Sequence, residues 1–418
     1  MPMSDAFKNR LFPKVGKIAD HFGTPFHIYD EAGIRETGQT VVSAFSNIEG
    51  FREFFAVKAL PNPTIMEIMM SMGFGFDCSS VPELVLSRRI GAGPDDIMFT
   101  SNNTSAEEFQ AALGDGGCIL NLDDISLIDK VPRMPELLCF RYNPGERRTG
   151  NNIIGNPVEA KYGLTHEQMI SAYRKVYEKG IRRFGLHAMI ASNELNYTYM
   201  VTTARMLLEL AEDISRSVPI RFEFINIGGG FGIPYRPEDK PLDIAAMGAD
   251  IAAAFYRFGQ DNGYAPKMFI ESGRYMTGPH GALVTRVINH KHIYRKYVGV
   301  DASMSALMRP GIYGAHHEIS VPGKSDGNLE CVDVVGALCE NIDKFAVQRL
   351  LPETEEGDLM VIHDTGAHGI AMGFNYNGRL RPKELLLRQD GSVELIRRQE
   401  TMDDYFATLN YEEKVLGF

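Results

Sequence analysis

Lys58 lies in the segment FFAVKALPNP, residues 54–63, directly after an apolar run that is typical of a buried strand. A lysine at a strand end often only extends its ammonium group into solvent. A partly desolvated lysine instead favours the neutral amine, which attacks an aldehyde and forms a Schiff base. The remaining polar motifs decide between these two interpretations.

Two further motifs supply chemistry that complements a lysine. In FIESGR, the carboxylate of Glu271 suits a pyridinium N–H, and the guanidinium of Arg274 suits an anion. INIGGGFGIP holds three residues without a Cβ, whose N–H groups can approach a phosphate: Gly228, Gly229 and Gly230. Taken singly, these motifs are ordinary loops or ion pairs. A lysine, a phosphate cradle and a carboxylate together match pyridoxal 5′-phosphate (PLP), so we predict a Schiff-base role for Lys58.

Eight short apolar runs, separated by stretches with helical periodicity, have to position these groups. The runs cover residues 54–59, 74–79, 96–101, 118–123, 136–143, 183–190, 221–230 and 267–274. Eight strand–helix units over about 230 residues predict a closed, TIM-like (β/α)8 barrel of class α/β. We place it at residues 32–278. A doubly wound open sheet is the competing fold, but the dinucleotide fingerprint that it requires is missing from the sequence.

Polar residues lie at or near the ends of most of these runs, and the carboxyl ends of barrel strands face the active site. The residues at these ends are Lys58, Asp77, Asn121, Arg141, Ser192, Gly228 to Gly230, and Glu271. The glycines end the seventh run, and barrels often bind phosphate after their seventh and eighth strands. The sequence therefore predicts that these side chains lie around one barrel mouth.

The rest of the chain predicts a second domain. After about residue 280, apolar and polar residues alternate, and QDGS at residues 389–392 marks a turn between two strands. The strand-like PFHIYD, residues 25–30, is expected to join them. We predict an antiparallel β domain, a barrel or sandwich, from residues 1–31 and 279–418.

Composition limits the partners. The chain has 418 residues, 44% hydrophobic and 23% charged, and a net charge of −11 without a basic block, so nucleic acid is not expected as a partner. It has no 18-residue apolar run and no signal-peptide core, so we expect a cytoplasmic protein without a membrane partner. Five scattered cysteines without a CxxC pair predict reduced thiols and no metal site.

The motifs resemble those of a known family. AVKALPNP is similar to the AVKANPNP of fold-type III PLP decarboxylases, whose barrel precedes a β domain. RYNPG, AKYG, GGG and ESGR (the family's EPGR) follow in the family's order. The segments at residues 301–319, 336–343 and 363–382 resemble the diaminopimelate decarboxylase branch, so the similarity covers almost the whole chain.

This resemblance implies an activity and a set of site residues. The activity is decarboxylation of meso-2,6-diaminopimelate to L-lysine and CO2, with Lys58 as the Schiff-base lysine and Cys339 as proton donor. The implied cofactor contacts are Lys58, Asp77, Arg141, Met189, Gly228, Gly229, Gly230, Glu271 and Tyr376. The implied substrate contacts are Ser192, Arg274, Arg309, Tyr313, Glu340 and Tyr376. In the family, the loop of Cys339 and Glu340 reaches the neighbouring subunit, which implies a head-to-tail homodimer with shared active sites.

One motif departs from the family. HxHIGSQ is replaced by HAMIASN at residues 187–193, so Met189 stands where a histidine usually stacks on the PLP ring, and Ala191 and Asn193 also differ. A thioether can still pack on an aromatic face. The departure keeps open a decarboxylase of the same fold that acts on another amino acid or a carboxylated polyamine precursor. More distant alternatives are a racemase, a non-catalytic PLP-binding protein and a PLP-free Schiff-base aldolase.

Overall fold

The computed structural model describes residues 3–114, 116–151, 153–324 and 327–409. The chain divides into two compact units. The first is Glu31–Pro279; the second joins Met3–Asp30 to the described chain from His280 onward.

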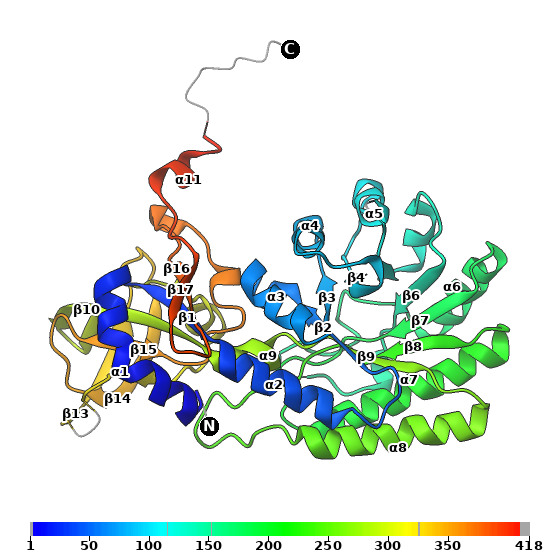
Figure 1. Ribbon diagram of the computed structural model, residues 1–418, viewed down its shortest axis with the longest axis horizontal. Helices are drawn as coiled ribbons and strands as arrows, with labels where there is room; N and C mark the ends of the chain where they lie inside the picture. Colours follow the sequence, from blue (N-terminus) through cyan, green and yellow to red (C-terminus); the bar gives the residue numbers. More distant parts are fainter. Residues whose placement is uncertain (1–2, 115, 152, 325–326, 410–418) are drawn as a thin grey trace, which may run out of the picture. The chain divides into compact units, whose positions relative to one another are not determined.

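Eight parallel strands close the first unit into a barrel in chain order (Figure 1), which confirms the TIM-like prediction. Each of the eight apolar runs overlaps one of its strands. The strands are β2 (Arg52–Ala56), β3 (Gly75–Cys78), β4 (Ile97–Phe99), β5 (Ile119–Leu122), β6 (Leu137–Arg141), β7 (Arg183–His187), β8 (Phe222–Asn226) and β9 (Lys267–Ile270).

Helices alternate with these strands. Most begin at a side chain that caps the first turn: Ser105 accepts a hydrogen bond from Glu108 N, and Thr165 accepts one from Gln168 N. After β5 the connection is a 3-10 segment, η3 (Ile125–Lys130). The helices are α2 (Glu31–Ala44), α3 (Pro63–Ser71), α4 (Val81–Arg89), α5 (Ala106–Leu113), α6 (His166–Glu178), α7 (Tyr197–Ser217), α8 (Ile244–Asn262) and α9 (Arg274–Thr277).

Aromatic rings fill the barrel interior. The Phe224 and Phe269 rings stack with centroids 4.4 Å apart, and Phe54 packs on Phe269 at 4.9 Å. Neighbouring strands carry glycine where these rings need room: a Cβ at Gly185 would lie 2.0 Å from the Phe224 ring, and one at Gly75 would lie 2.6 Å from Phe54. The interior is therefore packed, and the polar chemistry is left to the strand ends.

The second unit is built on a nine-stranded sheet, which confirms a separate β domain. The sheet is mixed rather than purely antiparallel, because β1 pairs in parallel with β16 and β11 pairs in parallel with β13. Its strands are β1 (Phe26–Asp30), β10 (Gly281–His292), β11 (Lys296–Val300), β12 (Ile319–Ser320), β13 (Leu329–Val335), β14 (Lys344–Pro352), β15 (Leu359–Ile362), β16 (Lys383–Leu387) and β17 (Val393–Arg397). Its helices are α1 (Asp5–Phe22), α10 (Arg309–Tyr313) and α11 (Met402–Phe406).

Helix α1 holds the first 30 residues to this sheet. Its buried residues Phe7, Leu11, Val15 and Ile18 recur at helical spacing and pack with strand residues such as Phe26 in one apolar cluster. The expectation that PFHIYD joins the β domain is met, because β1 lies between β10 and β16.

Candidate active site

Lys58 follows strand β2 immediately, in a one-turn 3-10 segment, η1 (Val57–Ala59). Val57 and Ala59 are buried, whereas the Lys58 side chain is 48% exposed. Its Nζ lies 4.0 Å from Oδ2 of Asp77, which is on the neighbouring strand β3. The lysine is thus fixed at its base and accessible at its amine, as a lysine that bonds to a small aldehyde must be.

Asp77 is a buried carboxyl in an acidic neighbourhood. Burial, together with the negative charge of Glu271, raises the pKa of Asp77 to about 8 against the opposing charge of Lys58. The protonated form of Asp77 is therefore favoured near neutral pH when no other cation is present. A cationic group bound beside Lys58 would favour the ionised form instead.

Glu271 directly follows strand β9 and is held by two neighbouring strand ends. Asn226 Nδ2, on β8, donates to Oε1 at 2.7 Å, and His187 Nε2, on β7, lies 3.2 Å from Oε2. Asn121 Nδ2, on β5, donates to His187 Nδ1 at 2.8 Å, which assigns the His187 proton to Nε2 and directs it at Glu271.

The same contacts keep Glu271 ionised. Its burial alone would raise its pKa, but His187, Lys58 and the Asn226 amide oppose the effect, and the pKa is lowered from the ordinary value. Each carboxylate oxygen retains acceptor capacity beyond its present bond. Glu271 is therefore a pre-formed buried anion, suited to accept an N–H from a pyridine ring.

The three glycines form a loop that admits no side chain. A Cβ would lie 2.3 Å from Ala188 O at Gly228, 2.0 Å from Glu271 O at Gly229 and 2.4 Å from Ala191 O at Gly230. Gly228 and Gly230 also have φ of 72° and 94°, in the left-handed region that favours glycine. The Gly228 N–H is already taken by Asn226 Oδ1 at 2.9 Å. The glycine loop after β8 therefore packs directly against the backbone of Glu271.

Met189 contacts this cradle. Its Sδ lies 3.2 Å from Gly229 N, so in this structure the thioether packs on the glycine loop. Asn193 has a left-handed φ of 51°, which asparagine tolerates, and its Oδ1 accepts a hydrogen bond from Ile233 N at 3.0 Å. Ser192, also predicted, has its N–H bonded to Asn151 Oδ1 at 3.1 Å. Met189 and Asn193, which depart from the family motif, therefore have local structural partners.

Arg141 ends strand β6, but its guanidinium is engaged within the protein. Nε donates to Asp123 Oδ1 at 2.6 Å, and the group lies 4.7 Å from the centre of the Tyr162 ring. Asp123 also accepts the N–H of Gly163 at 2.9 Å. Through Asp123, these contacts link the RYNPG motif to the AKYG motif at the barrel mouth. A direct contact between Arg141 and the cofactor stays a prediction.

Arg274 opens helix α9 in the first unit, and its Nη1 donates to the Tyr235 hydroxyl at 2.7 Å. In the second unit, Arg309 begins helix α10 and is buried, with Nη1 3.1 Å from His317 Nε2. His317 Nδ1 lies 2.8 Å from the His363 carbonyl oxygen, to which it donates, so Nε2 accepts from Arg309. Arg309 is therefore oriented by a neutral histidine.

The remaining predicted residues lie in exposed parts of the second unit. Tyr313 and Tyr376 are 63% and 51% exposed, and Cys339 and Glu340 lie in an exposed loop. The Cys339 N–H donates to Asn377 Oδ1 at 2.6 Å, which joins this loop to the segment of Tyr376.

The carboxylate of Asp343 holds the loop of Cys339 through backbone hydrogen bonds. Asp343 accepts the N–H groups of Met304 at 2.6 Å and Leu338 at 2.8 Å. The loop is therefore ordered from within the second unit, although its reactive side chains face outward.

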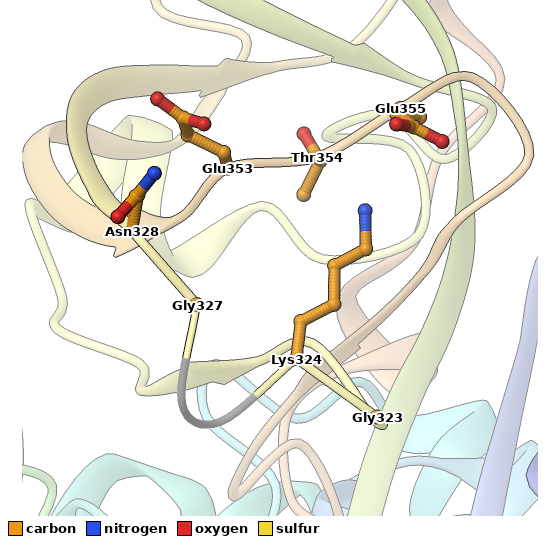
Figure 2. Close-up of a pocket in the computed structure, with 7 residues that line it drawn as sticks. All are labelled: Gly323, Lys324, Gly327, Asn328, Glu353, Thr354 and Glu355. Carbon is orange, nitrogen blue, oxygen red and sulfur yellow. The ribbon is translucent and has the colours of Figure 1, made fainter.

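A surface pocket of the second unit contains none of these residues. Figure 2 shows its lining, in which the Lys324 ammonium group points toward the open space. That ammonium is paired with Asp358 at 2.7 Å, and two glutamates complete the charged lining. The lysine of this pocket is held by a carboxylate, and no run of glycines or buried acid is among its described lining residues, so we assign the candidate active site to the barrel mouth.

Sequence reasoning missed several residues that hold the site. Asn226, His187 and Asp123 bind the predicted residues directly. Their position at strand ends was the available signal. No cluster of three or more potential metal ligands occurs in the described chain. No helix in the described ranges has the length and apolarity to cross a membrane.

A barrel mouth with an accessible lysine, a glycine loop that admits no side chain and a buried anion is the arrangement expected of a PLP enzyme of the barrel class, and these residues fit that cofactor. Residues 32–278 match the family model of the pyridoxal-dependent decarboxylase, pyridoxal binding domain. The chain therefore belongs to the pyridoxal-dependent decarboxylase family, its cofactor is PLP, and it is a PLP-dependent amino-acid carboxy-lyase.

Individual relatives match over nearly their whole length. Protein TabA of Pseudomonas amygdali pv. tabaci is 47% identical, covering 99% of this chain and 97% of that protein. The diaminopimelate decarboxylase of Methanothermobacter thermautotrophicus is 36% identical, covering 96% and 95%. The crystal structure of diaminopimelate decarboxylase from M. jannaschii in complex with L-lysine aligns with a TM-score of 0.87 and 28% identity, covering 95% and 94%.

Proposed function

We propose that this enzyme converts meso-2,6-diaminopimelate to L-lysine and CO2. The observation that carries the proposal is the pre-formed Glu271 anion opposite an accessible Lys58, in a chain whose curated relatives include diaminopimelate decarboxylases over almost its full length. When bound, PLP supplies the electron sink that accepts the electron pair of the breaking Cα–carboxylate bond.

Each residue of this chain has a limited task in that reaction. Lys58 would hold the cofactor through its ε-amine, which has to become free again when the substrate amine binds. Glu271 accepts the N–H of the pyridine ring and so keeps the ring cationic. The thiol of Cys339 donates the proton that replaces the departing carboxylate at Cα. The sum is loss of CO2 and gain of one proton at the same carbon.

Recognition of the distal end of the substrate falls to the cationic and phenolic groups. Arg274, Arg309 and Tyr313 bind the second carboxylate, and Glu340 binds the second amine. Tyr376 and Ser192 complete the contacts with cofactor and substrate. We expect this reaction to occur in the cytoplasm.

The second candidate is decarboxylation of another amino acid by the same residues. It is favoured by Met189 and Asn193, and by the relative at 47% identity, whose name states no substrate. Incubation of the PLP-loaded enzyme with meso-diaminopimelate, with lysine followed by mass spectrometry, tests the proposal. Lysine formation above that of Lys58→Ala supports it; release of CO2 from a different amino acid, without lysine from diaminopimelate, selects the second candidate.

We also propose a head-to-tail homodimer in which the loop of Cys339 serves the partner's barrel. Mixing inactive Lys58→Ala and Cys339→Ala chains after mild dissociation should restore about a quarter of the activity, because one in four sites then has both residues intact at full statistical mixing. Activity that stays absent, with light scattering showing a monomer, would contradict the shared site.

A further inference from the structure

Glu53 is a buried carboxyl on strand β2 that the proposed mechanism does not use. It is 1% exposed, and its Oε1 accepts the backbone N–H of Ser272 at 2.7 Å. Its Oε2 has no hydrogen-bond partner among the described residues. Burial raises the pKa of Glu53 well above its ordinary value; the Ser272 N–H opposes this, and the charges of Glu271 and Asp77 add to it. A fully buried carboxyl without a cation is costly, so its retention in the strand that leads to Lys58 calls for a role.

The backbone of residues Glu271 and Ser272 is the point where three parts of the site meet. Glu271 N donates to Gly228 O at 2.9 Å, on the glycine cradle. Ser272 O accepts from Ala56 N at 3.5 Å, at the end of strand β2. Ser272 N is held by Glu53, also on β2. Two of these three hydrogen bonds therefore tie the backbone N–H and C=O of Ser272 to the strand that leads to Lys58.

We propose that Glu53 is a positioning residue for Glu271: by accepting the Ser272 amide hydrogen it fixes the Glu271–Ser272 peptide on strand β2, and so sets the distance between the Glu271 carboxylate and Lys58. The inference rests on the proposed role of Glu271 toward the pyridine nitrogen. Ser272 is the other member of this pair, because only a residue with a backbone N–H can donate a hydrogen bond to the Glu53 carboxylate. The EPGR pattern has proline, which has no amide hydrogen, at this place.

Four variants test the pairing: Glu53→Gln, Glu53→Met, Ser272→Pro, and Glu53→Met with Ser272→Pro. Glutamine keeps a neutral acceptor oxygen, methionine removes it at similar volume, and proline removes the donor. The readouts are the dissociation constant of PLP, the pH midpoint of the visible absorbance of the bound cofactor, and the melting temperature of the cofactor-free protein. Phe109→Leu, in the buried face of helix α5, is the control for simple destabilisation.

The pairing predicts a specific pattern. Glu53→Gln should keep the PLP dissociation constant within about twofold of the wild type. Glu53→Met should weaken PLP by about tenfold and shift the pH midpoint, because an unpaired buried N–H displaces the peptide that carries Glu271. Ser272→Pro alone should also weaken PLP, since the Glu53 carboxyl loses its donor. The double variant should recover most of the loss, because neither group then lacks a partner.

Two results would overturn the inference while leaving the proposed function intact: additive losses in the double variant, or a Glu53→Met protein that melts earlier but keeps the wild-type pH midpoint, as Phe109→Leu should. A wild-type chain that binds no PLP would overturn the proposed function and this inference with it.

Discussion

Replacing Glu271 with glutamine tests the electrostatic design of the site. Glu271 accepts hydrogen bonds from Asn226 at 2.7 Å and His187 at 3.2 Å while it stays ionised. A glutamine keeps one acceptor oxygen, turns its NH2 group toward the second donor, and offers no charge to the pyridine nitrogen.

The expected loss follows from these contacts. A hydrogen bond to a charged group exceeds a neutral one by about 1 kcal/mol, and a buried donor left without an acceptor costs about 1–3 kcal/mol. The sum of about 3 kcal/mol corresponds to a loss of kcat on the order of 100-fold. The assay is release of CO2 from meso-diaminopimelate at saturating PLP, with the dissociation constant of PLP measured separately.

A matched control separates this effect from the mere loss of a carboxylate. Glu223→Gln, on the adjacent strand β8, removes an exposed carboxylate that pairs with Arg183 at 2.6 Å. Its kcat should stay within about twofold of the wild type, since exposed pairs contribute little. A Glu271→Gln enzyme with kcat within about threefold of the wild type would refute the assignment of Glu271 to the pyridine nitrogen.

Three further substitutions have defined outcomes. Arg309→Ala should raise KM for diaminopimelate at least about 30-fold, since losing the arginine that pairs with a buried anion costs about 2–5 kcal/mol. Arg309→Lys should recover only part of the lost affinity. Unchanged kinetics would remove Arg309 from the site. Gly229→Ala should abolish PLP binding in a titration, because its Cβ would lie 2.0 Å from a backbone oxygen, whereas Gly16→Ala, with open space around it, should bind normally; equal binding by both would contradict the cradle. The pKa of Asp77 is raised to about 8, so the cofactor-free wild type should lose stability as the pH rises from about 4 to about 8. Asp77→Asn should therefore raise the free energy of unfolding, measured with urea, more at alkaline than at mildly acidic pH. A difference between variant and wild type that does not change with pH would contradict this.

The barrel was predictable because its signals are local. Each strand is an apolar run with a polar residue at its end, and eight such runs fit one closed sheet. Lys58 and Asp77 lie at neighbouring strand ends for this reason. The parallel pairing of β1 with β16 was not predictable, because the two buried strands lie far apart in the sequence and nothing local to either sets their relative direction.

The supporting contacts of the site were not predictable, because they join side chains far apart in the sequence. Nothing local to Asn226 or His187 indicates that both bind Glu271. Arg141 was assigned to the cofactor from its motif, yet its guanidinium binds Asp123, a partner that only the closed barrel supplies. Residue type and position predict which groups gather at the mouth, but the division of contacts among them requires the three-dimensional arrangement.

Borohydride trapping tests the central claim most directly. The protein is incubated with PLP, reduced, digested and mapped by mass spectrometry. The account predicts a pyridoxyl group on the peptide that contains Lys58 and its absence from that peptide in Lys58→Arg. A label on a different lysine of the wild-type chain, or no label at all, would contradict it.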